Sequence, residues 1–371
     1  MDLEKIVSVT SCQSYNFPLV RQSLAALLEP FGGLEHFMGP GSRVLIKPNL
    51  LTAAAPEKVV TTHPAVIKGL ILAAQETGAQ VFVGDSPMGG TLKKVAAAAG
   101  IMAVVEETGA SLLPFLQAKT VSFPAGKACT NFPLAKEALE MDFIINAGKL
   151  KTHSLTGLTL AVKNCYGFLA NKDKMRYHAR YPIVHDFADF LLDLYLAIKP
   201  GLSLVDAVVG MDGPGPRVGR PKPLGALLAS TNGVALDAVC AELTGFSTNE
   251  VTTLHQAARR NIPGHDLRKL EIKGPLETLR CRTFDKGISI GGWSFLWRYA
   301  PTLARHLQQR RRAWPLVSEE CNQCGTCLKH CPAEVMQVVA GSREKKVTID
   351  YKKCLRCYCC QEICPQGAIK I

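Results

Sequence analysis

The chain contains 371 residues, of which 47% are hydrophobic and 20% are charged, a length that suits two or three domains and a composition typical of globular proteins. This excludes an intrinsically disordered or collagen-like protein. Lysine and arginine outnumber aspartate and glutamate by 43 to 31, which gives a net charge of +12. The longest uncharged apolar run, residues 95–105, is shorter than the roughly 18 to 20 residues of a membrane span, and the first residues lack the pattern of a signal peptide. We therefore expect a cytoplasmic protein without a transmembrane segment.

The excess positive charge is concentrated in two segments. Residues 143–185 and residues 286–318 each carry a net charge of +6, so the rest of the chain is neutral overall. This pattern predicts two local positive sites and not a uniformly basic surface of the kind that binds nucleic acid. Because no aromatic stacking motif accompanies the lysines, we do not expect nucleic-acid binding.

Short apolar runs alternate with helical patterns over the first 290 residues. Strands are predicted at residues 6–9, 44–46, 81–83, 143–146, 202–209 and 226–229. Helices are predicted from about residue 18, at 63–77, 93–99, 183–198 and 234–243, and within 157–169. Residues 112–136 have no clear pattern. The alternation predicts an α/β domain with a largely parallel sheet over residues 1–290.

Polar residues follow several of the predicted strands. They are Lys47 and Asn49 after one strand, Asp85 after the next, and Lys149, Lys151 and His153 after residues 143–146. In parallel sheets, ligands bind beyond the carboxyl ends of the strands, so these side chains are expected to form one site. Closely spaced lysines repel one another unless an anion or a carboxylate such as Asp85 offsets their charge. A pair of solvated lysines on a surface loop would account for the same residues.

Two further segments contribute candidate residues. Residues 61–64, Thr-Thr-His-Pro, are typical of a helix start, where a threonine hydroxyl can cap the helix and free amides favour an anion. His63 gains nothing obvious from that position. Lys163 and Asn164 lie in an otherwise apolar helical pattern, and they either reach the surface or face a site. The neighbouring Cys165 is interpreted as a small buried residue.

The glycine- and proline-rich segment 213–220 lacks the spacing of a dinucleotide-binding loop. Its prolines also remove backbone amides that a phosphate would need. We interpret it as a rigid loop that presents Arg217 and Arg220 to the site, or as a turn with two solvated charges. The sequence contains no Walker loop, no H-E-x-x-H and no G-x-S-x-G motif, so it gives no support to nucleotide hydrolysis or serine catalysis.

Six motifs of the first domain together resemble a known family. They are Lys47–Asn49, Thr62–Pro64, Gly84–Pro87, Lys149–His153, Lys163–Asn164 with Gly167, and Val234–Val239. This set resembles the family known as domain of unknown function 362, across residues 40–245, whose members are often joined to a ferredoxin module. The resemblance implies membership of the family but no particular reaction.

From the strand ends and these motifs we expect one site for a small anionic ligand. The expected ligand-binding residues are Lys47, Asn49, Lys149, Lys151, Lys163 and Asn164. The candidate catalytic residues are His63, Asp85 and His153, which would supply protons if the ligand is reduced.

Residues 291–313 combine several aromatic side chains with Arg310, Arg311 and Arg312. We expect a basic linker helix that packs its aromatic side chains on the α/β domain and presents its arginines to an acidic redox partner protein. A packed helix with a solvated end, or a helix on a membrane surface, would fit the same residues.

Nine of the fourteen cysteines lie in the last 51 residues. They include two runs of Cys-x2-Cys-x2-Cys-x3-Cys-Pro, which begin at Cys321 and Cys354, and each position of the second run lies 33 residues after its counterpart in the first. Because the cytoplasm keeps thiols reduced, this spacing indicates metal binding and not disulfides. Two such runs together hold two iron-sulfur clusters. Three cysteines of each run bind one cluster, and the fourth, which precedes proline, binds the cluster of the other run.

The duplicated pattern resembles the bacterial two-cluster ferredoxin module over residues 314–371, which is a small α+β domain. The resemblance implies one [4Fe-4S] cluster on Cys321, Cys324, Cys327 and Cys364, and a second on Cys331, Cys354, Cys357 and Cys360. Cys359 has no counterpart in the first run, where position 326 is Thr. It is interpreted as a spare thiol, or else as a replacement for Cys360.

The leading hypothesis is an iron-sulfur electron-transfer protein whose cofactors are two [4Fe-4S] clusters. The clusters would relay low-potential electrons to or from an α/β domain that binds an anionic ligand, which would make the protein an oxidoreductase. The alternative is a non-catalytic electron carrier, or an assembly or docking protein that uses its basic surfaces. Clusters that only hold a small domain together are the remaining interpretation of the cysteine runs.

Overall fold

The computed structural model describes residues 2–170, 173–287, 313–338 and 347–371. The linker helix predicted for residues 291–313 lies outside these ranges, except for its last residue. Within the described residues, no helix is both long enough and apolar enough to cross a membrane.

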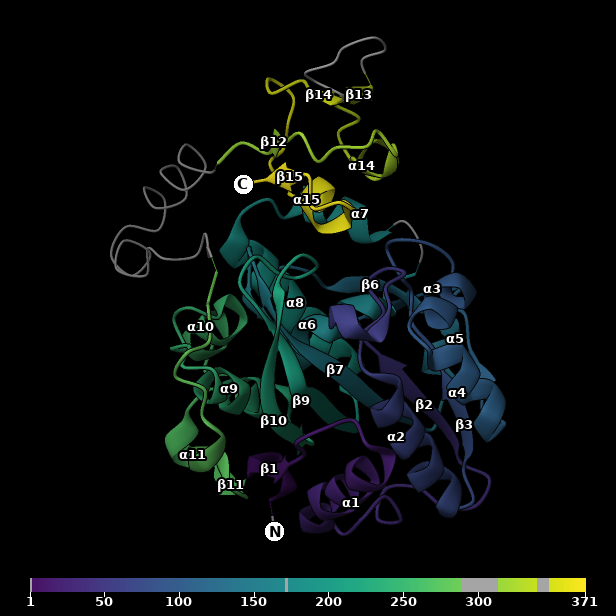
Figure 1. Ribbon diagram of the computed structural model, residues 1–371. Helices are drawn as coiled ribbons and strands as arrows, with labels where there is room; N and C mark the ends of the chain where they lie inside the picture. Colours follow the sequence, from purple (N-terminus) through teal and green to yellow (C-terminus); the bar gives the residue numbers. More distant parts are fainter. Residues whose placement is uncertain (1, 171–172, 288–312, 339–346) are drawn as a thin grey trace.

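One mixed sheet forms the centre of the first domain (Figure 1). Its strands, in spatial order, are β11 (Glu271–Lys273), β1 (Ile6–Ser11), β10 (Arg220–Ser230), β9 (Leu202–Asp212), β7 (Phe143–His153), β2 (Arg43–Pro48), β3 (Gln80–Val83) and β4 (Ser111–Leu112), with β8 (Gly157–Thr159) paired to β7. Neighbouring strands from β9 to β4 are parallel, as are β11 and β1, whereas β10 is antiparallel to both β1 and β9. The predicted α/β domain with a largely parallel sheet is therefore confirmed.

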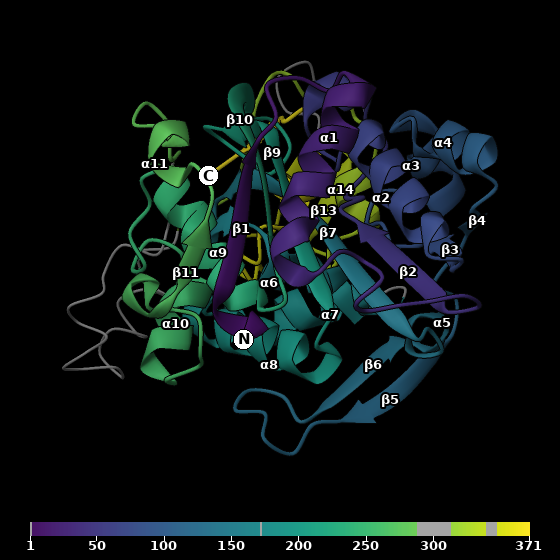
Figure 2. The same ribbon diagram turned by 90° about the horizontal axis from the view of Figure 1, so that it is seen from below.

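Two layers of helices cover the two faces of this sheet (Figure 2). One layer contains α1 (Phe17–Leu28), α2 (Pro64–Glu76), α3 (Leu92–Ala98) and α4 (Ile101–Thr108). The other contains α6 (Ala161–Asn164), α8 (Val184–Ile198), α9 (Gly233–Leu243) and α10 (Thr252–Arg259). Each layer buries its apolar side chains against one face of the strands, so the sheet separates two hydrophobic cores. The short helices α5 (Lys136–Leu139), α7 (Asp173–Arg180) and α11 (Leu276–Leu279) complete the domain.

The start of α2 differs from the interpretation of its threonines as caps. Pro64 occupies the first turn, where its missing N–H is not needed, and the Nδ1 atom of His63 accepts a hydrogen bond from the Ala65 amide at 3.2 Å. The hydroxyl of Thr62 instead donates to the Ala147 carbonyl at 2.8 Å. His63 is therefore the N-cap of α2, and Thr62 connects this turn to β7.

Strand β7 is longer than predicted, because it continues from Asn146 through His153. Lys149, Lys151 and His153 therefore lie within the strand and not in a loop after it, and as alternate residues they share one face. A buried strand tolerates these polar residues because each finds partners on neighbouring strands and loops.

A helix does lie within residues 157–169, as predicted, but it occupies only part of that range. These residues form β8, then α6, then a 3-10 turn at Cys165–Phe168. Leu160 is extended, and the buried carboxylate of Asp237 accepts hydrogen bonds from the amides of Ala161 and Val162, at 2.8 and 3.3 Å. This contact from α9 fixes where α6 begins. Residues 112–136, which had no clear pattern, contain the antiparallel pair β5 (Ala118–Ser122) and β6 (Asn131–Ala135).

The last described residues form a small second domain with a core of its own. Two short antiparallel pairs, β12 (Leu316–Val317) with β15 (Ile369–Lys370) and β13 (Met336–Val338) with β14 (Val347–Ile349), flank α14 (Thr326–Lys329) and α15 (Cys359–Ile363). The first strand pairs with the last one, so the two halves of the repeat enclose one core. In Figure 1 this domain sits over one end of the α/β domain, with α15 close to α7.

Candidate functional site

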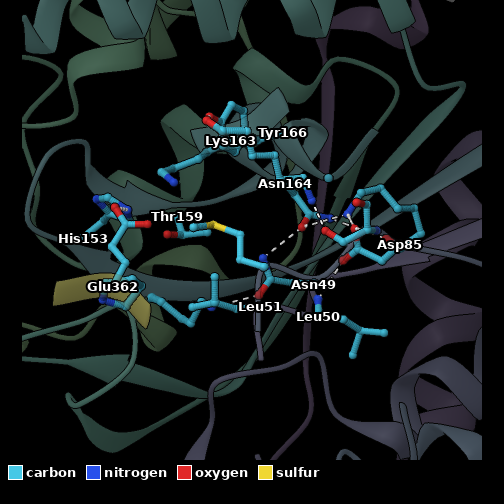
Figure 3. Close-up of a pocket in the computed structure, with 17 residues that line it drawn as sticks. Asn49, Leu50, Leu51, Asp85, His153, Thr159, Lys163, Asn164, Tyr166 and Glu362 are labelled. Atoms are coloured by element: carbon cyan, nitrogen blue, oxygen red, sulfur yellow. Dashed lines mark hydrogen bonds and ion pairs between the residues drawn. The ribbon is translucent and has the colours of Figure 1, made fainter. Parts of the chain in front are cut away.

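A cavity of about 60 Å³ lies where the parallel strands β2, β3 and β7 end, at the border with the second domain (Figure 3). The described residues that line it include seven expected from the sequence, namely Lys47, Asn49, Asp85, Lys151, His153, Lys163 and Asn164. Ser86 and Pro216 also line it and lie in segments that follow predicted strands, whereas Thr159, Tyr166, Lys174 and Glu362 were not expected. We call this cavity the lysine pocket.

The side of the pocket next to β2 and β3 is held by a buried ion pair. The Lys47 ammonium lies 3.0 Å from Asp85 Oδ1 and also donates to the Pro48 carbonyl at 2.8 Å. The second Asp85 oxygen accepts a hydrogen bond from the Leu50 amide at 2.8 Å. Gly167 lies against this pair, and a Cβ atom there would overlap both side chains. Lys47 and Asp85 therefore hold each other and the loops around the pocket.

A chain of amide side chains connects this pair to Lys151. Asn49 donates to Asn164 Oδ1 at 2.9 Å, and Asn164 donates to Asn146 Oδ1 at 2.8 Å. Lys151 donates to Asn49 Oδ1 at 2.8 Å and to the Val60 carbonyl at 2.7 Å. A lysine ammonium has three N–H donors, so Lys151 keeps one for another acceptor. Burial lowers the pKa of Lys151 to about 7, and the charges of Lys163 and Lys149 add to this effect.

Lys163 and Thr159 are two donors of the pocket without a hydrogen-bond partner among the described residues, and His153 Nε2 is a third. Lys163 forms no hydrogen bond or ion pair with any residue in the described ranges, and its Nζ atom lies 5.8 Å from the ring centre of Tyr166. The buried Thr159 hydroxyl likewise has no hydrogen-bond partner among the described residues. Burial lowers the pKa of Lys163, and Glu362 opposes that shift. In Figure 3 both side chains point toward the space beside His153 and Glu362.

The second domain contributes one wall of the pocket through Glu362 of α15. Its Oε1 atom lies 3.0 Å from His153 Nε2, although the angle is not that of a good hydrogen bond. His153 Nδ1 accepts from the Leu155 amide at 3.1 Å, so the proton of the neutral ring is on Nε2, which faces Glu362. Burial lowers the pKa of His153 to about 4. Burial raises the pKa of Glu362, but His153 and Lys163 lower it by more, so Glu362 is a carboxylate at neutral pH.

Lys149 and His63 lie in a separate cluster and are not among the described residues that line the pocket. The Lys149 ammonium lies 2.8 Å from Asp206 Oδ2 and donates to the Tyr15 hydroxyl at 2.7 Å. Tyr15 donates to the other Asp206 oxygen at 2.9 Å and stacks on the His63 ring, with 3.5 Å between ring centres. Burial lowers the pKa of His63 to about 4. The strand-end residues therefore form two sites and not one.

Segment 213–219 connects β9 to β10, and the arginine within it and the arginine that begins β10 lie in different places. Arg217 donates from Nη1 to the Ile363 carbonyl of the second domain at 2.9 Å. Arg220 is largely exposed and pairs with Asp212 and Asp285 of its own domain. Neither arginine is among the described residues that line the pocket, whereas Pro216 is.

Further contacts fix the second domain over the pocket. His330 Nε2 lies 2.9 Å from the Met88 carbonyl, and an apolar cluster joins Leu155 and Val184 to Tyr358. The backbone at Gly367 approaches Val218 so closely that a Cβ atom at position 367 would overlap the Val218 side chain. These contacts place α15 directly at the pocket wall.

The cysteines of the repeat surround two small cavities in the second domain. One is lined by Cys321, Cys324, Cys327 and Cys364, and the other by Cys331, Cys354, Cys357 and Cys360. The remaining lining side chains are mostly apolar, as is usual around iron-sulfur clusters, so the donor sets fit two such groups. Cys359 is fully buried and lines neither cavity.

Several functional side chains had no signal in the sequence. Tyr15, Asp206 and Glu362 are far in the chain from their partners, and none stands in a pattern that indicates a site. Knowledge of the strand register would have located Asp206 beside Lys149, because the two residues are direct neighbours in the parallel pair β7–β9.

Comparison with known proteins gives matches for both domains. Residues 44–242 match the family described as Domain of unknown function (DUF362), and residues 320–368 match the 4Fe-4S dicluster domain. A thylakoid-associated protein of Synechocystis is 36% identical over 260 residues, which cover 67% of this chain and 78% of that protein. An uncharacterized ferredoxin of Methanocaldococcus jannaschii is 33% identical over 49 residues, which cover 13% of this chain and 74% of that protein.

Among solved structures, the lactate racemase apoprotein of Thermoanaerobacterium thermosaccharolyticum is similar over 67% of this chain and 58% of that chain, with 13% identity and a TM-score of 0.41. The chain thus spans less than two thirds of that protein. The family match, in contrast, covers more than half of the present sequence. The chain therefore belongs to the DUF362 family, and it carries a 4Fe-4S dicluster domain after the family domain.

Proposed function

We propose that the protein is an iron-sulfur electron-transfer protein in which two [4Fe-4S] clusters exchange low-potential electrons with a small anionic ligand held in the lysine pocket. The observation that carries the proposal is the position of Glu362. It lies between Cys360 and Cys364, one from each proposed ligand set, and it also forms a wall of the pocket. A ligand in the pocket would therefore lie beside the helix that carries cluster ligands.

The ligand sets of the clusters follow from the two cysteine-lined cavities. Cys321, Cys324, Cys327 and Cys364 would hold one cluster, and Cys331, Cys354, Cys357 and Cys360 the other. When bound, each [4Fe-4S] cluster accepts or donates one electron at a potential set by its surroundings. Two clusters thus match the two electrons of a common organic reduction.

Lys151 is the best-placed proton donor for such a reduction. Its pKa of about 7 lies near neutral pH, where a general acid works best, and one of its N–H groups is free of protein acceptors. His153 borders the pocket as a neutral hydrogen-bond donor. Asp85 is fully engaged with Lys47 and backbone amides, and His63 caps a helix outside the pocket, so we assign neither of them to proton transfer.

The test uses the full chain, purified anaerobically with its clusters. Small molecules released from it are identified by mass spectrometry, and the cluster reduction potential is measured with and without the anion found. We expect an anion that co-purifies with the wild type, is lost in Lys163→Met, and shifts the potential. An anion that binds without any effect on the potential or on cluster reoxidation would contradict coupling between the domains and favour the alternative, a non-catalytic carrier or docking protein.

A redox partner protein is part of the proposal, because the clusters need a source or acceptor of electrons. The sequence Arg310-Arg311-Arg312 supports an acidic partner, since complementary charge accelerates encounter at low salt. Replacing all three arginines with glutamine is expected to slow electron exchange at low salt and leave the iron content unchanged. Equal rates for both proteins at low and high salt would contradict this role.

A further inference from the structure

The lysine pocket is suited to a particular class of anion and not to anions in general. Three of its properties define that class: its unsatisfied donors, its charge and its size. Within the described residues, Lys151 keeps one unused donor, Lys163 keeps all three, and Thr159 keeps its hydroxyl. A buried donor without an acceptor is costly, so the buried Lys151 and Thr159 indicate a missing acceptor. The half-buried Lys163 ammonium offers its donors to the same pocket. Lys47 offers no free donor, since the Pro48 carbonyl, Asp85 and Asn164 surround its Nζ atom.

The charge of the lining residues sets the charge of the ligand. Among the described residues, four lysines and two carboxylates line the pocket, and His153 is neutral, so the balance with all lysines protonated is +2. The lysines are Lys47, Lys151, Lys163 and Lys174, and the carboxylates are Asp85 and Glu362. The two carboxylates offset only two of the four ammonium groups, so an anion would stabilise the remaining positive charge. A ligand with two negative charges would neutralise the pocket.

The size of the pocket limits the ligand. A volume of about 60 Å³ has room for a few water-sized atoms, although one side of the pocket is open. We propose that the lysine pocket is selective for a small, doubly charged organic oxyanion, such as a two-carbon dicarboxylate, and that inorganic dianions bind there as unreactive mimics. This inference rests on the proposed function and deepens it by naming the class of ligand.

The binding mode assigns different roles to the lining residues. Lys151, Lys163 and Thr159 contact the oxyanion, whereas Lys47, Asn49 and Asn164 hold the surrounding frame through hydrogen bonds to one another. Glu362 excludes larger or more highly charged anions, because it places a negative charge and the bulk of α15 at one wall. Specificity then comes partly from a repulsive group.

The experiment is isothermal titration calorimetry on the full chain with its clusters. The probes are sulfate, phosphate and oxalate as small dianions, nitrate and acetate as monoanions, and glycerol 3-phosphate as a bulky dianion. We expect each small dianion to bind at least about tenfold more tightly than either monoanion, in line with the second charge. Glycerol 3-phosphate distinguishes a free oxyanion from one attached to a larger molecule, and we expect it to bind weakly or not at all.

Two variants locate the binding. Thr159→Val keeps the shape of the side chain and removes the hydroxyl, and Lys163→Met keeps the stem and removes the charge; each is expected to weaken sulfate binding about tenfold or more. Lys93→Met, at an exposed lysine of α3, is the matched control and is expected to bind like the wild type. Unchanged affinity in both pocket variants would overturn the inference, as would monoanions that bind as tightly as dianions. If only bulky anions bind, the size class is wrong although the proposed function stands; if no anion binds, both are wrong.

Discussion

Gly167 has only a hydrogen atom as its side chain, and this leaves room for the ion pair between Lys47 and Asp85. The position where a side chain would attach to Gly167 lies directly against the Lys47–Asp85 ion pair. The φ angle of Gly167 is one that any residue adopts. A substitution there would therefore act by volume alone, without added backbone strain.

We expect Gly167→Ala to reduce the free energy of unfolding by about 1–3 kcal/mol, the usual effect of overpacking a core. It should also weaken anion binding, because Lys47 and Asp85 would have to separate. Chemical denaturation and calorimetry measure the two effects. Gly148→Ala on β7 is the matched control, since its new Cβ atom would meet only ordinary van der Waals contacts at 3.6 Å. Equal stability of the two variants would contradict the prediction.

The low pKa values of two pocket lysines predict a pH dependence of anion binding. Burial lowers the pKa of Lys151 and of Lys174 to about 7, and the anion binds their protonated forms. As pH rises through 7 these protons are lost, so affinity falls, by up to about tenfold per pH unit for each proton that must be taken up. The charged groups facing Lys151 include Lys149, Lys163, Asp85 and Glu362.

Sulfate is the suitable probe, because its charge does not change between pH 6 and 9. Its affinity should be highest near pH 6 and fall steadily above pH 7, while His153, with a pKa of about 4, stays neutral throughout. Lys151→Met should bind more weakly and show a shallower slope. Affinity that is independent of pH in the wild type would contradict the role of these lysines.

Cys359 and Cys360 are neighbours with different expected roles. Cys360 lines a cysteine cavity, whereas Cys359 is buried outside both cavities. We expect Cys359→Ser to retain about eight iron atoms per chain, the content of two cubane clusters. Cys360→Ser and Cys331→Ser should each damage the second cluster, although Cys331 belongs to the first run. Iron analysis and electron paramagnetic resonance measure this, and iron loss in Cys359→Ser alone would reverse the assignment.

At the scale of elements, β7 carries two lysines whose surroundings differ. Lys149 and Asp206 are both fully buried and neutralise each other across the strand pair, whereas no carboxylate of the described ranges lies within hydrogen-bond reach of Lys151. Lys149 and Lys151 are thus only two positions apart on one strand, but Lys149 forms a structural ion pair, whereas Lys151 is proposed to bind the ligand.

We expect Lys149→Met to destabilise the protein by about 3–5 kcal/mol, since it leaves the buried Asp206 carboxylate without its partner. Adding Asp206→Asn should recover part of this loss. Lys151→Met should cause a much smaller loss of stability and abolish most anion binding. Thermal and chemical denaturation, with calorimetry on the folded variants, measure these effects. Equal losses of stability in the two single variants would contradict the distinction.

The sequence predicted best those elements whose pattern is set by burial alone. Strands β2, β3 and β9 and helices α2, α8 and α9 each match a predicted apolar run, with ends that differ by a few residues. The prediction was incomplete where a tertiary contact decides the local structure. Asp237, seventy-six residues away, fixes the start of α6, and partners on other strands allow β7 to continue through two lysines. Local pattern contains neither of these contacts.

At the scale of the whole molecule, Arg217 connects the two domains. It donates to the Ile363 carbonyl, and its charge lies close enough to Cys324 and Cys364 to interact with their thiolates. A positive charge near a cluster favours its reduced, more negative state. The sequence indicated a rigid loop here but not the partner, because contacts between distant loops leave no periodic pattern.

We therefore expect Arg217→Ala to make the reduction potential of the cluster on Cys321, Cys324, Cys327 and Cys364 more negative. Redox titration followed by electron paramagnetic resonance measures the shift. Arg220→Ala is the matched control, since Arg220 begins β10 at the end of the same connection but pairs only with acidic residues of its own domain. The same shift in both variants would mean a general effect of net charge and not the contact seen here.

Helix α15 and the residue that follows it take part in three proposed binding sites. The helix and the residue after it contribute Cys360 and Cys364, one to each cysteine cavity, and Glu362 to the lysine pocket. Events that fix the same short segment are thermodynamically linked, and such linkage is reciprocal. Bound sulfate should therefore slow the removal of iron by a chelator, and chelated protein should bind sulfate more weakly. If the proposed sites are correct, the same linkage would apply during biogenesis: insertion of the clusters would complete the ligand site, so an immature chain would not compete for the ligand.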